Sequence, residues 1–236
     1  AYVMVAGKHH FFPLRQLETL RYSIEETYQG LYSQIRKFLG QSAETGYSPE
    51  PGTELTYARY GLWNYLKAGK KNSSRYKDLQ RAGSNLRGLI RVMLFKRFES
   101  SVFAFRETVT RLEKKQEIFI KCLDEGIVPA GKEAQKILYE SDRYDQLELF
   151  DALETYSGTY DLKDFEAEKL REHLKKDQEI LQEILRLISS ISPDKDVKLQ
   201  LFLSKLKNGF PKATGKVLVF TQYADTAKYL FNALNK

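Results

Sequence analysis

The chain has 236 residues, 42% of them hydrophobic, and its 14 Phe and 15 Tyr supply enough apolar surface for a core, so a disordered chain is not expected. No apolar run approaches the roughly 20 residues that span a bilayer, and the opening AYVMVAG lacks the basic start and apolar length of a signal peptide. The single cysteine, Cys122, excludes an internal disulfide framework and fits a reducing, cytosolic compartment.

The formal net charge of +7 is concentrated in one block of the sequence. Between Tyr57 and Arg97, eleven Lys and Arg residues accompany a single acid, Asp78, so this block carries +10 and the remainder carries −3. A basic block beside a slightly acidic remainder is typical of a protein with a phosphate-bearing partner. The alternative is a basic helix face whose charges are paired with acids from elsewhere in the fold.

The first predicted elements are a short strand near 19–24 and a helix that follows it. Apolar and polar residues alternate in the strand segment, as on a half-buried strand. Ser23 is expected to cap the helix, with Glu26 as its capping-box partner and Gly40 just beyond its last turn. Residues 40–54 contain three Gly and two Pro and are expected to form a loop.

The middle of the chain is predicted to be helical and to bury one continuous stripe. A short helix is expected at YARYGLWNYL (57–66), and the basic loop KAGKKNSSRYK (67–77) follows it. From Lys77 to Gly126 the pattern is helical almost throughout, and Pro129 lies beyond its end. Apolar residues in this stretch recur at spacings of four, three, four and three, which marks a buried face. These residues are Phe98, Val102, Phe105, Val109 and Leu112.

Two acidic helices are expected near 131–140 and 143–155, followed by one long helix over 161–191 that ends before Pro193. Apolar residues of the long helix lie close to a three-four repeat. This helix should therefore pack lengthwise on residues 98–125 as an antiparallel pair.

After Pro193 the sequence predicts a short helix, a loop, a buried strand at 216–221 and a final amphipathic helix. The predicted fold class is therefore mostly α. It combines several helices, including a long antiparallel pair, with a small α/β element whose strands lie near 19–24 and 216–221.

Motifs for self-contained chemistry are missing from the sequence. Gly-Lys occurs four times, but neither Ser nor Thr follows it, so no phosphate-binding loop of the GxxxxGK[ST] type is formed. No DExH-like box follows a strand, and His9, His10 and His173 have no zinc-ligand spacing. We expect this chain alone to bind neither nucleoside triphosphate nor a metal ion.

Three stretches, in order along the chain, resemble one family. They are FFPLRQLETLRYSIEETYQGLYSQI (11–35), LRGLIRVMLFKRFESSVFAFRETVTRL (86–112) and PDKDVKLQLFLSKLKNGFPKATGKVLVFTQYADTAKYL (193–230). Together they resemble Swi/Snf-related superfamily II helicases, above all the bacterial HepA/RapA-like branch. The second stretch is similar to the KR-x-ESS-x-x-AF segment of that branch. Lys216 to Gln222 in the third fits the family's motif IV, K-V-L-[IV]-F-[ST]-Q.

The resemblance implies a fragment of an ATP-driven translocase on double-stranded DNA with two RecA-like lobes, cytoplasmic and associated with the bacterial nucleoid. Its ATP and Mg²⁺ would be held by motifs outside this chain, so the fragment alone is expected to be inactive. The implied organisation is an inter-lobe linker (1–24), a basic helical region (25–125), an acidic helical insertion (126–192) and the start of the second lobe (193–236).

The resemblance and the basic block together indicate candidate contacts to the DNA backbone, which position the strand without reading its bases. The candidates are Lys67, Lys70, Lys71, Lys96, Arg97, Thr221 and Gln222.

Each candidate also has a purely structural interpretation. Thr221 or Asp225 could cap the final helix, and the KRFESS segment could serve helix packing and capping, with Arg97 salt-bridged to Glu99. At the level of the whole chain, the alternative function is a helical protein-interaction module without nucleic-acid binding, in which the acidic region 131–191 docks on a protein partner.

Overall fold

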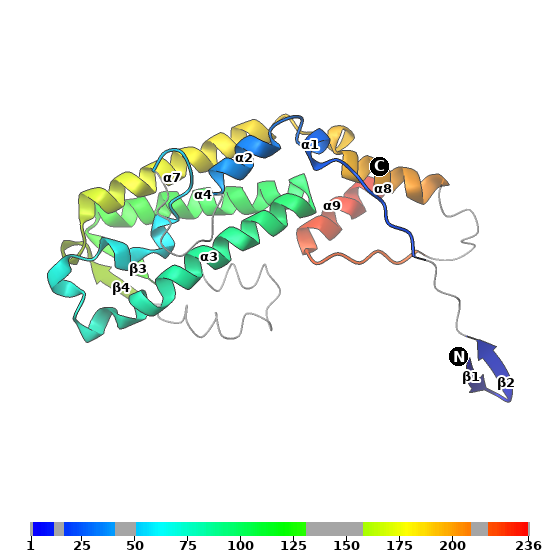
Figure 1. The fold of residues 1–236 in the computed structure, drawn as a ribbon, viewed down its shortest axis with the longest axis horizontal. Helices are drawn as coiled ribbons and strands as arrows, with labels where there is room; N and C mark the ends of the chain where they lie inside the picture. The colour runs from blue at the N-terminus through cyan, green and yellow to red at the C-terminus, as the bar shows by residue number, and fades with distance from the viewer. Residues whose placement is uncertain (1, 12–16, 41–50, 131–157, 209–216, 236) are drawn as a thin grey trace.

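The structure, a computed structural model, describes residues 2–11, 17–40, 51–130, 158–208 and 217–235 (Figure 1). The predicted class is confirmed: the described chain is mostly helical with small β elements. In chain order the elements are β1 (Tyr2–Val5), β2 (Lys8–Phe11), α1 (Ile24–Thr27), α2 (Tyr32–Phe38), η1 (Ala58–Tyr60), η2 (Leu62–Tyr65), η3 (Ala68–Lys70), η4 (Ser74–Tyr76), α3 (Lys77–Ser100), α4 (Val102–Asp124), β3 (Ile127–Ala130), β4 (Gly158–Asp161), η6 (Leu162–Asp164), α7 (Ala167–Ile188), η7 (Pro193–Lys195), α8 (Val197–Asn208) and α9 (Ala224–Leu234). No helix in the described part of the chain is long and apolar enough to cross a membrane.

Helices α4 and α7 form the predicted antiparallel pair, and Figure 1 shows them side by side along their length. Hydrogen bonds between the two helices show that they are antiparallel, because residues near the start of α4 contact the end of α7 and later residues of α4 contact earlier residues of α7. Near the start of α4, Arg106 donates to the carbonyl oxygens of Ile188, the last residue of α7, and of Ile191 just beyond it. Further along, Gln116 donates to the carbonyl of Leu174 at 2.9 Å.

The helical stretch from Lys77 onward is two helices, with a break that the hydrophobic pattern did not reveal. Ser101 is extended (φ −157°, ψ 148°), and its hydroxyl accepts the Ala104 N–H at 3.1 Å, so it caps α4. The apolar stripe from Phe98 to Leu112 is buried on both sides of this break. The break, which we call the elbow, turns the chain back on itself, so that α3 and α4 meet there (Figure 1).

The N-terminal helix begins and ends where the sequence predicted, but it is divided. Ser23 accepts the Glu26 N–H at 3.1 Å, and Gly40 follows the last turn with φ +90°. Between α1 and α2 the backbone turns left-handed at Gln29 and Gly30, which ends one helix before the next begins.

The strands lie elsewhere than predicted. β1 pairs with β2 across a turn at Ala6 and Gly7, and β3 pairs with β4, both antiparallel. Residues 17–23 and 217–221 are not strands in the described structure. A strand needs a neighbour whose backbone completes its hydrogen bonds, and these two segments do not pair with each other.

Helix α7 begins at Ala167 and not at the predicted Asp161, because Gly158–Asp161 form β4 and the Asp161 side chain caps η6 instead. The short helix η7–α8 after Ser192 and the final helix α9 follow the prediction. The acidic helices predicted near 131–140 and 143–155 lie outside the described residues.

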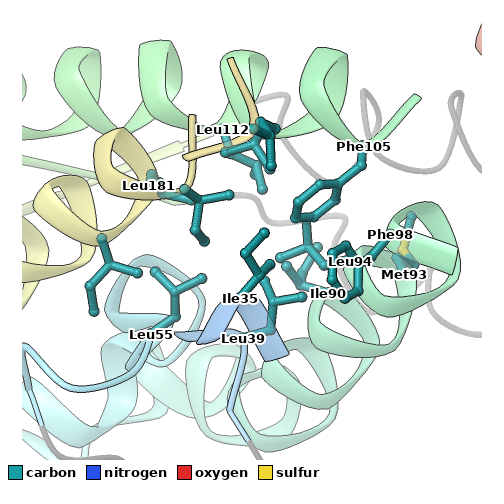
Figure 2. Packing of buried hydrophobic residues seen from close by; sticks show 14 of the residues in the cluster. Ile35, Leu39, Leu55, Ile90, Met93, Leu94, Phe98, Phe105, Leu112 and Leu181 are labelled. Atoms are coloured by element: carbon teal, nitrogen blue, oxygen red, sulfur yellow. The ribbon is translucent and has the colours of Figure 1, made fainter. Parts of the chain in front are cut away.

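The core consists of two buried clusters. The larger one joins α2, α3, α4 and α7, and Figure 2 shows Ile35, Leu94, Phe105 and Leu181 pointing toward one another within it. The smaller one packs the 3₁₀ segments against the other end of α4 and α7, around Phe119. The elbow lies at the end of the larger cluster, where Phe98 and Phe105 pack with ring centroids 4.9 Å apart.

Candidate nucleic-acid interface

The basic residues between Tyr57 and Arg97 do not form one continuous solvent-exposed surface. Two of its members are buried: Arg59, and Arg97, of which only 1% is exposed. Lys77 and Lys96 are exposed near the two ends of α3, which is about 36 Å long at 1.5 Å per residue. The exposed charge is therefore spread over the segment 67–75 and along α3, while part of the block is buried inside the fold.

Two of the three predicted loop lysines have internal partners. The Lys67 ammonium donates to the carbonyl of Lys163 at 2.7 Å, and Lys70 pairs with Asp164 at 2.8 Å. Asp164 also accepts a short hydrogen bond from the Tyr76 hydroxyl. The Lys70 and Tyr76 donors lower the pKa of Asp164, so this carboxylate ties the basic loop to η6. Lys71 is partly exposed beside them.

At the elbow, Arg97 points into a contact with α9. Its guanidinium pairs with Asp225 at 2.8 Å and lies 4.4 Å from the centre of the Tyr223 ring. The predicted partner Glu99 is wrong, because residues two apart on a helix do not face each other. Glu99 is exposed on α3.

Ser100 and Ser101 have the packing and capping role that the sequence suggested for the KRFESS segment. Both hydroxyls lie within hydrogen-bonding distance of the Thr226 hydroxyl, at 3.1 and 3.0 Å. The ring of Phe103 stacks on that of Tyr229 with centroids 5.4 Å apart. The first turns of α9 are thus held on the elbow by an ion pair, a hydroxyl cluster and an aromatic stack.

Thr221 and Gln222 are exposed just before α9. The Thr221 hydroxyl accepts the Tyr223 N–H at 3.4 Å, a weak cap-like contact outside the helix. Thr221 also lines a cavity of about 260 Å³ that the hydroxyls of Ser100, Ser101 and Thr226 share. This cavity brings the two predicted site segments, KRFESS and the segment before α9, to one place.

Helix α8 closes the other side of this cavity. Asp196 caps α8 at the Leu199 N–H (3.1 Å) and accepts the Tyr229 hydroxyl at 3.1 Å. The Lys198 ammonium donates to the carbonyls of Glu99 and Ser100 at the end of α3, and burial lowers its pKa. Lys198 therefore stabilises the carbonyl end of α3, where a positive charge is favoured.

The first of the three sequence stretches meets the elbow as well. The rings of Tyr28 and Tyr32 pack on Phe98, with centroids 4.3 and 5.0 Å apart, and the Tyr28 hydroxyl donates to the Phe98 carbonyl at 2.7 Å. Tyr22 donates to the Glu99 carbonyl and lies under the Lys198 ammonium. Residues from 11–35, 86–112 and 193–230 thus converge at the elbow.

Sequence reasoning missed Asp225 as the partner of Arg97, and Arg111 as the second partner of Asp225. Arg111 approaches the second carboxylate oxygen of Asp225 at 3.4 Å. The available signal was a basic residue within α4, but its acidic partner lies 114 residues away.

The groups at the elbow can bind and position a ligand. No group of three His, Cys, Asp or Glu side chains that could hold a metal ion occurs among the residues the structure describes. The cluster does offer guanidinium and hydroxyl donors, which suit an oxyanion such as phosphate. Comparisons with protein-family models, with curated proteins and with solved structures find no match to this chain.

Proposed function

We propose that this chain is part of an ATP-driven translocase on double-stranded DNA, of the Swi/Snf-related superfamily II type, and that it contributes DNA contacts and coupling between the two lobes. The observation that supports the proposal is the convergence at the elbow. Three stretches that resemble this family, far apart in sequence, pack against one another there through Tyr28–Phe98, Ser101–Thr226 and Arg97–Asp225.

The coupling role follows from how α9 is held. Helix α9 follows the motif IV segment, and its first turns lie against both α3 and α4. A shift of that segment would therefore reach α3 through the elbow, and α3 carries the exposed Lys77 and Lys96. ATP and Mg²⁺ would be bound by other parts of the motor and would drive that shift.

The DNA-binding part of the proposal can be tested by titrating duplex binding with salt. Removing one phosphate contact should reduce the magnitude of the slope of log K against log salt by about 0.9. We expect Lys77→Gln with Lys96→Gln to reduce the slope by roughly 1.8. The matched control is Lys114→Gln with Lys175→Gln, which removes two exposed charges from α4 and α7. Equal slopes for the two double variants would contradict DNA binding along α3.

Catalysis supplies an independent test. We expect the chain alone to show no ATP hydrolysis, with or without duplex DNA, because its sequence has no GxxxxGK[ST] loop. DNA-stimulated turnover by the purified chain would show that the nucleotide site lies within it and that the proposed division of labour is wrong.

A second candidate is a protein-interaction module, and one observation favours it. The segment 217–220 exposes a row of apolar side chains, with Leu218 76% and Phe220 89% exposed. If duplex binding fails, self-association is the first measurement to make. Sedimentation of the wild type against a Leu218→Ser, Phe220→Ser double variant would then show whether this row holds a second copy of the chain.

A further inference from the structure

Two arginines from different helices converge on one carboxylate at the elbow. Arg97, at the end of α3, holds one oxygen of Asp225 at 2.8 Å, and Arg111, in α4, approaches the other at 3.4 Å. Asp225 is itself mostly buried, whereas Arg111 is about one third exposed. A pair of guanidinium groups around one oxyanion is the arrangement that proteins use to bind phosphate.

Arg97 does not use all of its donors on Asp225. Its side chain is almost completely buried, and among the described contacts its Nε–H has no hydrogen-bond acceptor. A buried guanidinium with an unused donor is costly, since charge removed from water needs full compensation. Asp225 therefore occupies a site that could hold an anion with more acceptor oxygens.

The surroundings of this pair supply further donors. Thr226 follows Asp225 in the chain, and its hydroxyl contacts those of Ser100 and Ser101; these three residues line the cavity of about 260 Å³, whereas Arg97, Arg111 and Asp225 do not. The acid in that cavity, Asp196, is already bonded to the Leu199 N–H and the Tyr229 hydroxyl.

Helix α9 is suited to leave this site because it is held mainly by its first turns. Tyr223, Thr226 and Tyr229 are buried, but further along Phe231 is 66% exposed and Leu234 is half exposed. Undocking α9 would therefore expose less apolar surface than removing a helix with one fully buried face.

We propose that Arg97 and Arg111 form a phosphate-binding site that Asp225 occupies while α9 is docked, so that Asp225 and a phosphate group compete for the two arginines. That the phosphate belongs to the DNA backbone rests on the function proposed above. While α9 is docked, Asp225 blocks this site and the chain has one fewer contact to the DNA backbone. When α9 leaves the elbow, the two arginines are free to bind a DNA phosphate.

The central experiment compares Asp225→Asn with Asp194→Asn, which makes the same charge change at an exposed acid. Calorimetric titration with inorganic pyrophosphate measures the site without DNA. We expect Asp225→Asn to bind pyrophosphate about tenfold more tightly than the wild type, the equivalent of one charge-assisted hydrogen bond. Asp194→Asn should bind as the wild type does. Adding Arg111→Gln to Asp225→Asn should remove most of the gain.

Asp225→Asn leaves Arg97 without its carboxylate partner and could therefore fold poorly. A second variant tests the proposal without changing Asp225. Phe103→Ala removes the stack on Tyr229 and leaves both arginines and Asp225 in place. Because it loosens α9, it should also raise pyrophosphate affinity, by a smaller factor, while circular dichroism shows the other helices intact. An affinity unchanged in both variants, or a gain that survives Arg111→Gln, would overturn the proposal and leave the Arg97–Asp225 pair a packing contact.

Duplex DNA titrated against the same variants separates the two proposals. A gain for pyrophosphate without any duplex binding supports the site and contradicts the proposed function. Duplex binding that Asp225→Asn leaves equal to that of Asp194→Asn supports the function and contradicts the competition.

Discussion

Asp177, inside α7, accepts the backbone N–H of Thr56 at 2.7 Å across 121 residues of sequence. The same carboxylate accepts the Ala58 N–H and the Thr56 hydroxyl, each at 3.0 Å. It thereby fixes the irregular segment before η1 against the long helix, at a place where no regular secondary structure could satisfy those N–H groups.

The first prediction concerns the pH dependence that Asp177 creates. Burial raises its pKa from 3.8 to about 6, although the N–H and hydroxyl donors and nearby Arg59 partly offset this. Between these two values the folded state binds more protons than the unfolded state, so the contribution of Asp177 to stability falls as pH rises from about 4 to about 6. Above that range it is constant.

The check is the difference in unfolding free energy between the wild type and Asp177→Asn, measured by urea unfolding at several pH values. We expect the stability of the wild type relative to the variant to fall as pH rises from about 4 to about 6, and to be constant above pH 7. At neutral pH the variant should be less stable by about 1–3 kcal/mol, because its amide places an N–H against a backbone donor. A difference independent of pH would mean that Asp177 titrates normally.

The second prediction has the opposite sign and concerns Asp164. Its pKa is lowered by Lys70 and Tyr76, so its contribution is complete above the ordinary value of 3.8 and is lost as pH falls through the lowered folded value. Asp164→Asn should therefore lose stability at pH 7 and show a weaker decline below about pH 4 than the wild type. Thermal unfolding across this range tests the expectation, with Glu179→Gln, at an exposed acid of α7, as the control.

The third prediction separates the two serines of the elbow. Ser100 and Ser101 both contact Thr226, but only Ser101 caps α4. Ser101→Ala should cost more than Ser100→Ala by about 1 kcal/mol, the usual value of an N-cap hydroxyl. Equal losses in urea unfolding would show that the cap contributes little and that the contact with α9 dominates.

The sequence predicted those features that depend on neighbouring residues. The spacing from Phe98 to Leu112 identified the buried face that runs from the end of α3 into α4. Ser23 and Gly40 marked the ends of the N-terminal helical region because caps have local signatures. The break at Ser101 was missed, since the apolar stripe continues through it without a change of phase.

Features set by distant partners could not be predicted in this way. The alternation near 19–24 is a strand signal, but a strand forms only with a neighbour, and in the described structure Tyr22 donates to the Glu99 carbonyl instead. Likewise Arg97 was predicted to be a DNA contact from its neighbours in sequence. Its burial is decided by Asp225, 128 residues away.

The single extended residue at Ser101 is the point about which α3, which is packed along its length through Leu79, Leu86 and Ile90, would have to turn relative to α4. With the elbow as fulcrum and a length of about 36 Å, a tilt of about ten degrees would move the far end of α3, where Lys77 lies, by about 6 Å. That distance is nearly two base-pair steps of a duplex, which rises about 3.4 Å per step. If the chain binds DNA as proposed, such a tilt would change which phosphate Lys77 can reach.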